Sequence, residues 1–255
     1  MNKRMKNAVI LSVINNKGGV GKTTTALNLG AFLSEAGKKT LLVDMDSQCS
    51  LSKALGYDIV KEGTYSALKG ETYTIQKKTE SLRVLPAERA LAGFEVEIAS
   101  QPGSELRLKE TLEPLRQEYD FIIIDCPPTL SLLTYNALTA SNYYIVPVEC
   151  EYLALVGLEK MEELIRVINK YLNKDLKMLG VLMTKYDRRK SLNRQSVKLV
   201  AESYGELVFK TLIRDNIALA EAPISHVSIA EYAAGSNGAE DYRNLSKEVL
   251  KRVKR

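Results

Sequence analysis

Short apolar runs rich in β-branched residues alternate along the chain with longer amphipathic stretches. Each apolar run is typical of a buried strand, and each amphipathic stretch is typical of a helix. The predicted strands are 8–14, 40–45, 82–85, 120–125, 143–148, 177–184 and 207–213. The predicted helices are 23–36, 64–69, 88–99, 104–117, 130–140, 153–173, 191–204 and 239–253.

Several strand runs are apolar without interruption, among them Phe121-Ile122-Ile123-Ile124. A parallel sheet that is buried on both faces requires such runs. With the alternation of strand and helix, they predict an α/β fold: a doubly wound, mostly parallel sheet flanked by helices on both faces. No repeat, low-complexity tract or linker interrupts the pattern, so residues 1–255 are expected to form a single domain. The polar region 56–81 is expected to be a small excursion of short helix and loop.

Composition excludes several classes of protein. Three cysteines (Cys49, Cys126, Cys150) form no C-x-x-C pair, which argues against a disulfide framework or a zinc site. The single histidine, His226, argues against a histidine-based metal site or catalytic triad. A net charge of +5 permits contact with nucleic acid or anionic lipid but requires neither. No apolar run is long enough to cross a bilayer, and the one after the basic start is too short for a secretory signal, so we expect a cytoplasmic protein.

The most informative stretch is residues 15–25, Asn-Asn-Lys-Gly-Gly-Val-Gly-Lys-Thr-Thr-Thr, between a predicted strand and a predicted helix. This is the setting of a phosphate-binding P-loop. Its glycines let the backbone approach a phosphate, so that N–H groups of the loop and of the first helical turn point at phosphate oxygens. The residues expected to bind the nucleotide here are Lys17, Gly18, Gly19, Val20, Gly21, Lys22, Thr23 and Thr24.

Two side chains of this loop have the chemistry of a nucleotide site. Lys22 supplies a mobile cation for the β- and γ-phosphates, and Thr23 places a hydroxyl where Mg²⁺ would sit. The usual motif has a glycine at position 16, where this chain has Asn16 followed by a second lysine, Lys17. The resulting K-G-G-x-G-K-[ST] is the deviant form of the Walker A motif. A bare turn needs one glycine and no lysine, so the pattern favours a binding site.

Carboxylates follow two of the predicted strands. Strand 40–45 runs into Asp44-Met45-Asp46, and strand 120–125 ends in Asp125. From the carboxyl end of a parallel strand an aspartate can hold Mg²⁺, directly or through water. A plain capping role at the strand end is the alternative for all three, and more so for Asp44 and Asp46.

These motifs resemble those of the ParA/Soj partition ATPases. The resemblance rests on K-G-G-V-G-K-T-T, L-L-V-D-M-D-S-Q, D-F-I-I-I-D-C-P-P and V-P-V-E-C-E-Y-L-A-L-V-G-L, and it extends through A-L-A-E-A-P and Y-A-A-G-S-N-G-A-E-D-Y. No DNA-binding extension precedes the first strand, so the chain looks like the short, Soj-like subgroup.

The resemblance implies a P-loop NTPase with ATP and Mg²⁺ as cofactors and weak intrinsic ATPase activity. It implies an ATP-bound homodimer that binds DNA non-specifically, and a ParB-type partner that stimulates hydrolysis during plasmid or chromosome segregation. The expected location is cytoplasmic and nucleoid-associated.

The resemblance also implies roles for single residues. Lys17 is the signature lysine that reaches the nucleotide of the other subunit, and Lys22 contacts the β- and γ-phosphates. Asp46 positions the attacking water, so the expected catalytic residues are Lys17, Lys22 and Asp46. The metal is supported by Thr23, Asp44 and Asp125. Arg214 and Asn216 fall where the family lines the adenine pocket.

The chain departs from the family in two places. The first switch of the family usually reads D-x-D-P-Q-G-N, whereas residues 44–50 read Asp-Met-Asp-Ser-Gln-Cys-Ser and lack the proline and glycine. The family motif P-R-N is Arg214-Asp215-Asn216 here, so Asp215 replaces an arginine that contacts DNA in the family.

Two basic clusters are candidates for DNA binding, because non-specific binding needs cations gathered on one face. The first comprises Lys185, Arg188, Arg189, Lys190, Arg194 and Lys198, and the second, in the tail, comprises Lys247, Lys251, Arg252, Lys254 and Arg255. A solvated basic face without a ligand is the alternative for either cluster.

Two other functions use the same loop. A MinD-like positioning ATPase would bind a membrane surface through a C-terminal amphipathic helix. The apolar residues after Tyr242 (Leu245, Val249, Leu250 and Val253) lack the bulk of such an anchor, so no membrane binding is expected. A metabolic P-loop enzyme would need either two cysteines placed for a shared cluster or a pocket for an organic substrate.

Overall fold

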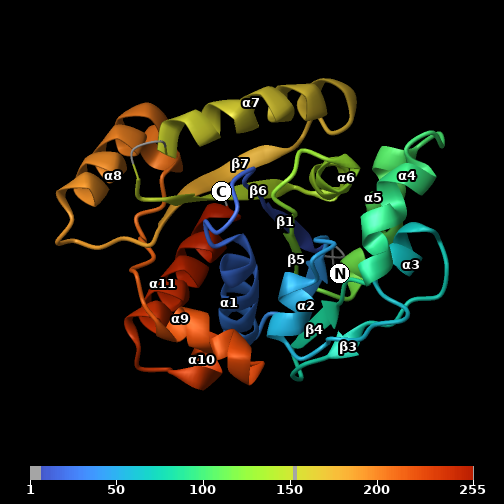
Figure 1. Cartoon of the computed structure of the whole chain (residues 1–255), viewed down its shortest axis with the longest axis horizontal. Coiled ribbons are helices and arrows are strands. Elements are labelled where there is room, and N and C mark those ends of the chain that lie inside the picture. Colours follow the sequence, from blue (N-terminus) through green and yellow to red (C-terminus); the bar gives the residue numbers. More distant parts are fainter. Residues whose placement is uncertain (1–6, 152–153, 255) are drawn as a thin grey trace, which may run out of the picture.

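The computed structural model describes residues 7–151 and 154–254, and these build a seven-stranded sheet between two layers of helices (Figure 1). The strand order is β3-β4-β2-β5-β1-β6-β7. All paired neighbours are parallel except β3 and β4, which are antiparallel at one edge. The strands are β1 (Val9–Val13), β2 (Thr40–Asp44), β3 (Gln76–Lys77), β4 (Leu82–Leu85), β5 (Phe121–Asp125), β6 (Tyr143–Glu149) and β7 (Lys177–Thr184). The predicted fold class, a doubly wound and mostly parallel α/β sheet, is confirmed.

The helices cover the sheet from both sides. Figure 1 shows α5, α6 and α7 on one side and α1, α10 and α11 on the other. The α-helices are α1 (Lys22–Glu35), α2 (Ser50–Ala54), α3 (Thr64–Leu68), α4 (Phe94–Ile98), α5 (Arg107–Leu112), α6 (Leu132–Ala140), α7 (Ala154–Tyr171), α8 (Ser191–Tyr204), α9 (Ala218–Glu221), α10 (Ile229–Tyr232) and α11 (Asn237–Arg252). Short 3-10 helices span Arg89–Gly93, Ser104–Leu106, Pro114–Gln117, Gly205–Leu207 and Ala222–Ser225.

The continuous apolar runs feed two separate cores. Ile122 and Ile124 of the central strand β5 pack toward α5, α6 and α7, whereas Ile123 between them packs toward α1 and α11. All three side chains are fully buried. Because side chains alternate across a strand, one apolar run supplies both faces, as a parallel sheet requires.

The last helix belongs to one of these cores. Tyr242, Leu245 and Val249 of α11 are almost fully buried, and Leu250 and Val253 are partly buried in the same cluster. The Tyr242 hydroxyl also lies 3.1 Å from that of Thr25 on α1. The apolar side of α11 therefore packs against α1.

One predicted strand, 207–213, is wrong. Residue Val208 makes only an isolated bridge to β7. The N–H groups of Lys210 and Thr211 instead donate to the carboxylate of Glu248 on α11, at 3.0 and 3.1 Å. Since these donors are taken by a side chain, no continuous ladder forms here.

Other differences concern short or broken elements. The predicted helices 88–99 and 104–117 are each divided into 3-10 and α-helical pieces, the second with Pro114 at a break. The elements β3, α2, α9 and α10 were not predicted, because two to five residues are too few to show a period. The predicted helix 153–173 is observed from Ala154, and residue 153 itself lies outside the described residues, as does Arg255 of the basic tail.

Gly180 of β7 is a position with no room for an added methyl group. A Cβ there would lie 2.6 Å from the backbone oxygen of Leu207 and 2.8 Å from Nη1 of Arg252, which donates to Leu179. We expect Gly180→Ala to lower the free energy of unfolding by about 1–3 kcal/mol, the usual cost of overpacking. Thermal unfolding measures it, with Gly235→Ala as control because no atom lies within 4 Å of a Cβ at that position. Equal melting temperatures for the two variants would contradict the packing described here.

Candidate nucleotide-binding site

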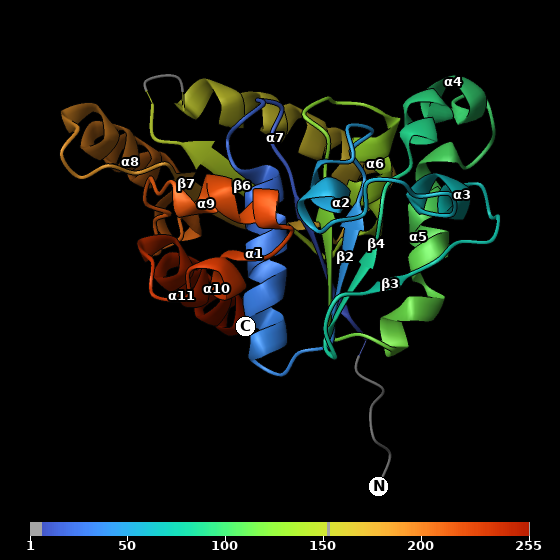
Figure 2. The same ribbon diagram turned by 60° about the horizontal axis from the view of Figure 1, so that its bottom comes forward.

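The glycine loop between β1 and α1 lies at the carboxyl edge of the sheet, the upper edge in Figure 2. Gly19 and Gly21 have φ angles of 76° and 92°, a backbone region that favours glycine. Two side chains hold the loop, Asn15 just after β1 and Thr184 at the end of β7. Asn15 Nδ2 donates to the carbonyl of Pro147 at 2.7 Å, and Thr184 Oγ1 donates to the carbonyl of Val20 at 2.9 Å.

The outer surface of the loop is bare backbone. A Cβ on Gly18 or Gly19 would have no other atom within 4 Å, so it would project into open space above the loop. A phosphate needs this space if it is to reach the N–H groups of the loop and of the first turn of α1. In that segment Lys17, Gly18 and Gly19 are exposed, Gly21, Thr23 and Thr24 are half-buried, and Val20 and Lys22 are buried.

Lys22 is folded onto its own loop. Its side chain is 7% exposed, and Nζ donates to the carbonyl of Lys17 at 2.9 Å. Burial lowers the pKa of Lys22, while the nearby Asp125, Cys126 and Asp46 act in the opposite direction. The ammonium group is thus placed beside the loop and partly stripped of water.

Lys17 takes a different direction. It forms an ion pair with Glu151, which follows β6. Its side chain remains 49% exposed. In the single chain the predicted signature lysine is therefore held by a carboxylate of its own subunit. Sequence reasoning missed Glu151, and its only signal was a second acid in V-P-V-E-C-E-Y.

Asp125 is the least satisfied charge in the described part of the chain. It is fully buried at the end of β5, and neither carboxylate oxygen accepts a hydrogen bond of normal geometry from a described residue. Burial and the neighbouring Asp44 raise the pKa of Asp125 well above its ordinary value, against the hydroxyl of Thr23 and the charge of Lys22. Two bare acceptor oxygens below a phosphate cradle fit a hard cation such as Mg²⁺.

Asp44 is already occupied. It pairs in register with Asp125 across β2 and β5. Its Oδ1 accepts from the N–H of Asp46 at 3.0 Å, and its Oδ2 accepts from the N–H and hydroxyl of Ser52 at 2.8 and 2.6 Å. Burial raises the pKa of Asp44 to about 6, although these hydrogen bonds counter it. Its observed contacts therefore shape the loop after β2, and Ser52 is a second residue that sequence reasoning missed.

Asp46 lies on that loop and is 9% exposed. One of its oxygens accepts from the N–H of Gln48 at 2.9 Å. Cys49, which stands where the family pattern has glycine, adopts a φ of 55° and is buried. The loop therefore keeps a left-handed backbone at a position occupied by a larger side chain.

The two residues predicted for the adenine pocket lie beside α9 and α11. The guanidinium of Arg214 is bound by Asp241, with Nε 3.0 Å from Oδ1, and by Glu240. Both acids raise the pKa of Arg214. The Oδ1 of Asn216 accepts from the N–H of Ala218 at 2.9 Å and so begins α9. Their role toward adenine stays a prediction.

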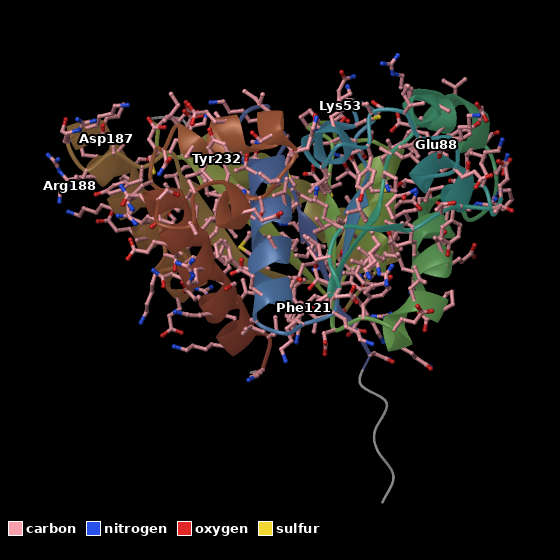
Figure 3. The ribbon with its side chains drawn as sticks, turned by 90° about the horizontal axis from the view of Figure 1, so that it is seen from below. Lys53, Glu88, Phe121, Asp187, Arg188 and Tyr232 are labelled. Atoms are coloured by element: carbon pink, nitrogen blue, oxygen red, sulfur yellow. The ribbon has the colours of Figure 1, made fainter. Side chains whose placement is uncertain are left out.

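The first basic cluster gathers around the loop after β7 and the start of α8. Figure 3 shows Asp187 and Arg188 at one end of the molecule. All six basic residues of the cluster are exposed. Arg189 is held by Asp187, Lys185 pairs with Glu149, and Lys198 lies 3.8 Å from Glu202. In the tail, Arg252 is bound to Glu248 and to backbone carbonyls, whereas Lys247, Lys251 and Lys254 are exposed.

The described residues contain no ready-made cluster of metal ligands and no membrane-spanning helix. No three or more histidine, cysteine or acidic side chains there come together as a metal-binding group. A Mg²⁺ site of the P-loop type does not need one, because phosphates and water supply most ligands. Among the described helices, none has the length and apolar character to cross a membrane.

Comparison with known proteins agrees with this geometry. A family model described as an AAA domain matches residues 8–178. Sporulation initiation inhibitor protein Soj of Bacillus subtilis is 46% identical over 246 residues, which cover 94% of this chain and 97% of that protein. Chromosome partitioning protein ParA of Myxococcus xanthus is 42% identical over 250 residues, which cover 95% of this chain and 88% of that protein.

A solved structure is similar over the same length. The crystal structure of a protein named cobyrinic acid a,c-diamide synthase from Mycobacterium smegmatis, with bound ADP and magnesium, is 36% identical. It superimposes with a TM-score of 0.85 and covers 97% of this chain and 96% of its own. The fold, the site and the Soj and ParA relatives agree: the chain belongs to the ParA/Soj family of partitioning ATPases.

Proposed function

We propose that the protein is a Mg²⁺-dependent ATPase that segregates DNA. Its ATP-bound homodimer binds DNA without sequence preference, and a ParB-type partner releases it by stimulating hydrolysis. The observation that carries the nucleotide chemistry is the buried, unpartnered carboxylate of Asp125 beside Lys22 and the bare glycine loop. The Myxococcus xanthus relative, named a chromosome partitioning protein, supports the biological role.

Thr23 and Asp125 would hold the metal, Asp125 directly or through water. A Mg²⁺ ion held there would supply positive charge against the negative charge that develops on the phosphates. Lys22, whose Nζ now donates to the carbonyl of Lys17, would contact the β- and γ-phosphates instead. Asp46, at the edge of the site and still slightly exposed, would orient the attacking water.

Lys17 would leave Glu151 and reach the nucleotide of the second subunit. Two opposed basic loops repel each other until phosphates lie between them, so dimerisation would depend on ATP. One lysine from each subunit would then neutralise the transition state without an arginine.

DNA binding fits the first basic cluster best. Arg188 projects from the loop tip, and no described residue pairs with its side chain (Figure 3). The carbonyl of Arg188 accepts from Nη1 of Arg194 at 2.6 Å, which keeps the two cations close. Binding of this kind depends on phosphate contacts and not on base sequence.

The two alternatives find less support. A lipid anchor would need the apolar residues of α11, which pack against α1 instead. A ligase, which the name of the Mycobacterium smegmatis protein raises, would need an organic-substrate pocket beside the loop. Binding of a small organic acid only in the presence of ATP would favour the ligase.

Removal of Lys17 tests the proposed dimer. We expect Lys17→Ala to lower the ATPase rate about 10³-fold or more, the effect of losing a transition-state cation supplied by a partner. It should also weaken the dimer that ATP induces, measured by size-exclusion chromatography. Lys38→Ala, at the opposite edge of the sheet, is the control. An ATP-induced dimer of unchanged strength would remove the role of Lys17 across the interface.

Neutralising Asp125 should stabilise the nucleotide-free protein and weaken its response to Mg²⁺ and ATP. Asp125→Asn removes a buried charge without partners, so we expect the nucleotide-free protein to gain about 1–3 kcal/mol in free energy of unfolding. The extra melting temperature conferred by Mg²⁺ and ATP should shrink at the same time. Asp175→Asn, an exposed acid at the amino edge, should change neither. A variant that still gains the full Mg²⁺-dependent increase would show that Asp125 does not support the metal.

Charge reversal tests the DNA surface. Arg188→Glu combined with Arg194→Glu should abolish ATP-dependent retention on DNA at moderate salt, because each dimer loses about four phosphate contacts. Lys38→Glu combined with Lys39→Glu makes the same change of charge at the opposite edge and should retain DNA. Equal retention by both double variants would place the DNA surface elsewhere.

A further inference from the structure

The ion pair between Lys17 and Glu151 connects the nucleotide loop to the basic cluster. Glu151 follows β6, and its backbone is held by α8 rather than by the loop that Lys17 comes from. We propose that Glu151 is a latch that retains Lys17 in its own subunit, and that α8 sets its position so that DNA contact releases it. This proposal rests on the proposed function, since it concerns how dimerisation and DNA binding are coupled.

Two buried side chains of α8 make the connection. Ser196 Oγ donates to the carbonyl of Glu151 at 2.9 Å, and Asn193 Nδ2 donates to the carbonyl of Cys150. Both side chains are less than 7% exposed. Buried polar groups that lose their partners are costly, so these bonds persist when α8 moves and carry residues 150–151 with it.

The other end of the same network is the surface proposed for DNA. The Oδ1 of Asn193 accepts from the N–H of Asp187 at 2.8 Å, so one amide side chain joins the loop tip to Cys150. Lys185 of that loop pairs with Glu149 at 3.1 Å. Phosphates that bind Lys185 and the neighbouring arginines would compete with Glu149 and Asp187 for the same cations. The segment 149–151 would then lose one of its ties.

The latch opposes dimerisation because two anions compete for the ammonium group of Lys17. In the single chain it has Glu151, and in the dimer it would have the partner's phosphates. Exposed ion pairs shift an equilibrium by up to about fivefold. Each dimer breaks two latches, so the dimer dissociation constant would be raised by up to about 25-fold. If DNA weakens the latch, linkage requires that dimerisation strengthens DNA binding by the same factor.

The first test removes the charge of the latch. Glu151→Gln should lower the dimer dissociation constant about 2- to 25-fold, measured by sedimentation velocity with Mg²⁺ and a non-hydrolysable ATP analogue and without DNA. Glu80→Gln is the matched control, since it removes an exposed acid that pairs with Lys77, outside both the nucleotide loop and the segment 149–151. Both acids are surface side chains, so both variants should fold, and their melting temperatures should stay close to that of the unchanged protein.

The second test breaks the connection and leaves the latch intact. A short duplex of random sequence should tighten the dimer of the unchanged protein, and Ser196→Ala should reduce this tightening. Ser203→Ala is the control on the same helix, because its hydroxyl donates only to Leu199 of α8 at 3.2 Å. A merely structural role for Ser196 would lower the melting temperature without changing the ratio of dissociation constants measured with and without DNA.

The outcomes separate two failures. A Glu151→Gln protein that dimerises no better than the Glu80→Gln control, or worse, would overturn the latch. ATP-dependent dimerisation of the unchanged protein would then leave the proposed function standing. An unchanged protein that forms no dimer with the ATP analogue would overturn the proposed function and the latch together.

Discussion

The whole site depends on the burial of the Asp125 carboxylate at the end of the central strand, which costs free energy. In the sheet order β5 lies between β2 and β1, so Asp125 stands in register with Asp44 on one side and Val13 on the other. Neither neighbour offers a donor to its oxygens. Burial of an acid without hydrogen bonds costs free energy that packing elsewhere in the sheet has to offset. Strain of this kind is found where a ligand completes the structure.

The charged groups near Asp125 are buried too, but they have hydrogen-bond partners that lower the free-energy cost of their burial. Asp44 lies equally deep but has three hydrogen bonds, which it uses to fix Asp46 and the start of α2. Lys22 is buried as well, and its Nζ donates to the backbone carbonyl of Lys17. Asp44, which fixes the loop after β2, and Asp125, whose oxygens accept no hydrogen bond from a described residue, are thus adjacent but distinct. Cys49 adds a smaller strain on the same loop, since a left-handed backbone costs a non-glycine residue roughly 1–2 kcal/mol.

The sequence predicted what depends on period and on local motif. Continuous apolar runs gave six of the seven predicted strands, and the glycine pattern located the loop with its lysines. It could not predict partners supplied from far along the chain. Glu248 takes the backbone donors of Lys210 and Thr211 and so removes the expected strand 207–213. Likewise Glu151, 134 residues from Lys17, determines where the signature lysine points, and no local pattern contains that pairing.

The first basic cluster is not simply free positive charge, because two of its cations already form ion pairs that bound phosphates would have to replace. Of its cations, Lys185 and Arg189 already have carboxylates, and both acids sit on segments tied to α8 through Asn193 or to the end of β6. In the proposed DNA complex, phosphates would bind these cations only by breaking existing pairs, and breaking the pair between Lys185 and Glu149 would remove a constraint on residues 149–151. An unpaired surface such as that of Arg188 would give affinity without consequence for the site. Where the cations are paired, as Lys185 and Arg189 are, DNA could bind only if the ion pairs broke. Binding would then always be accompanied by a local rearrangement, which coupling between two distant sites requires.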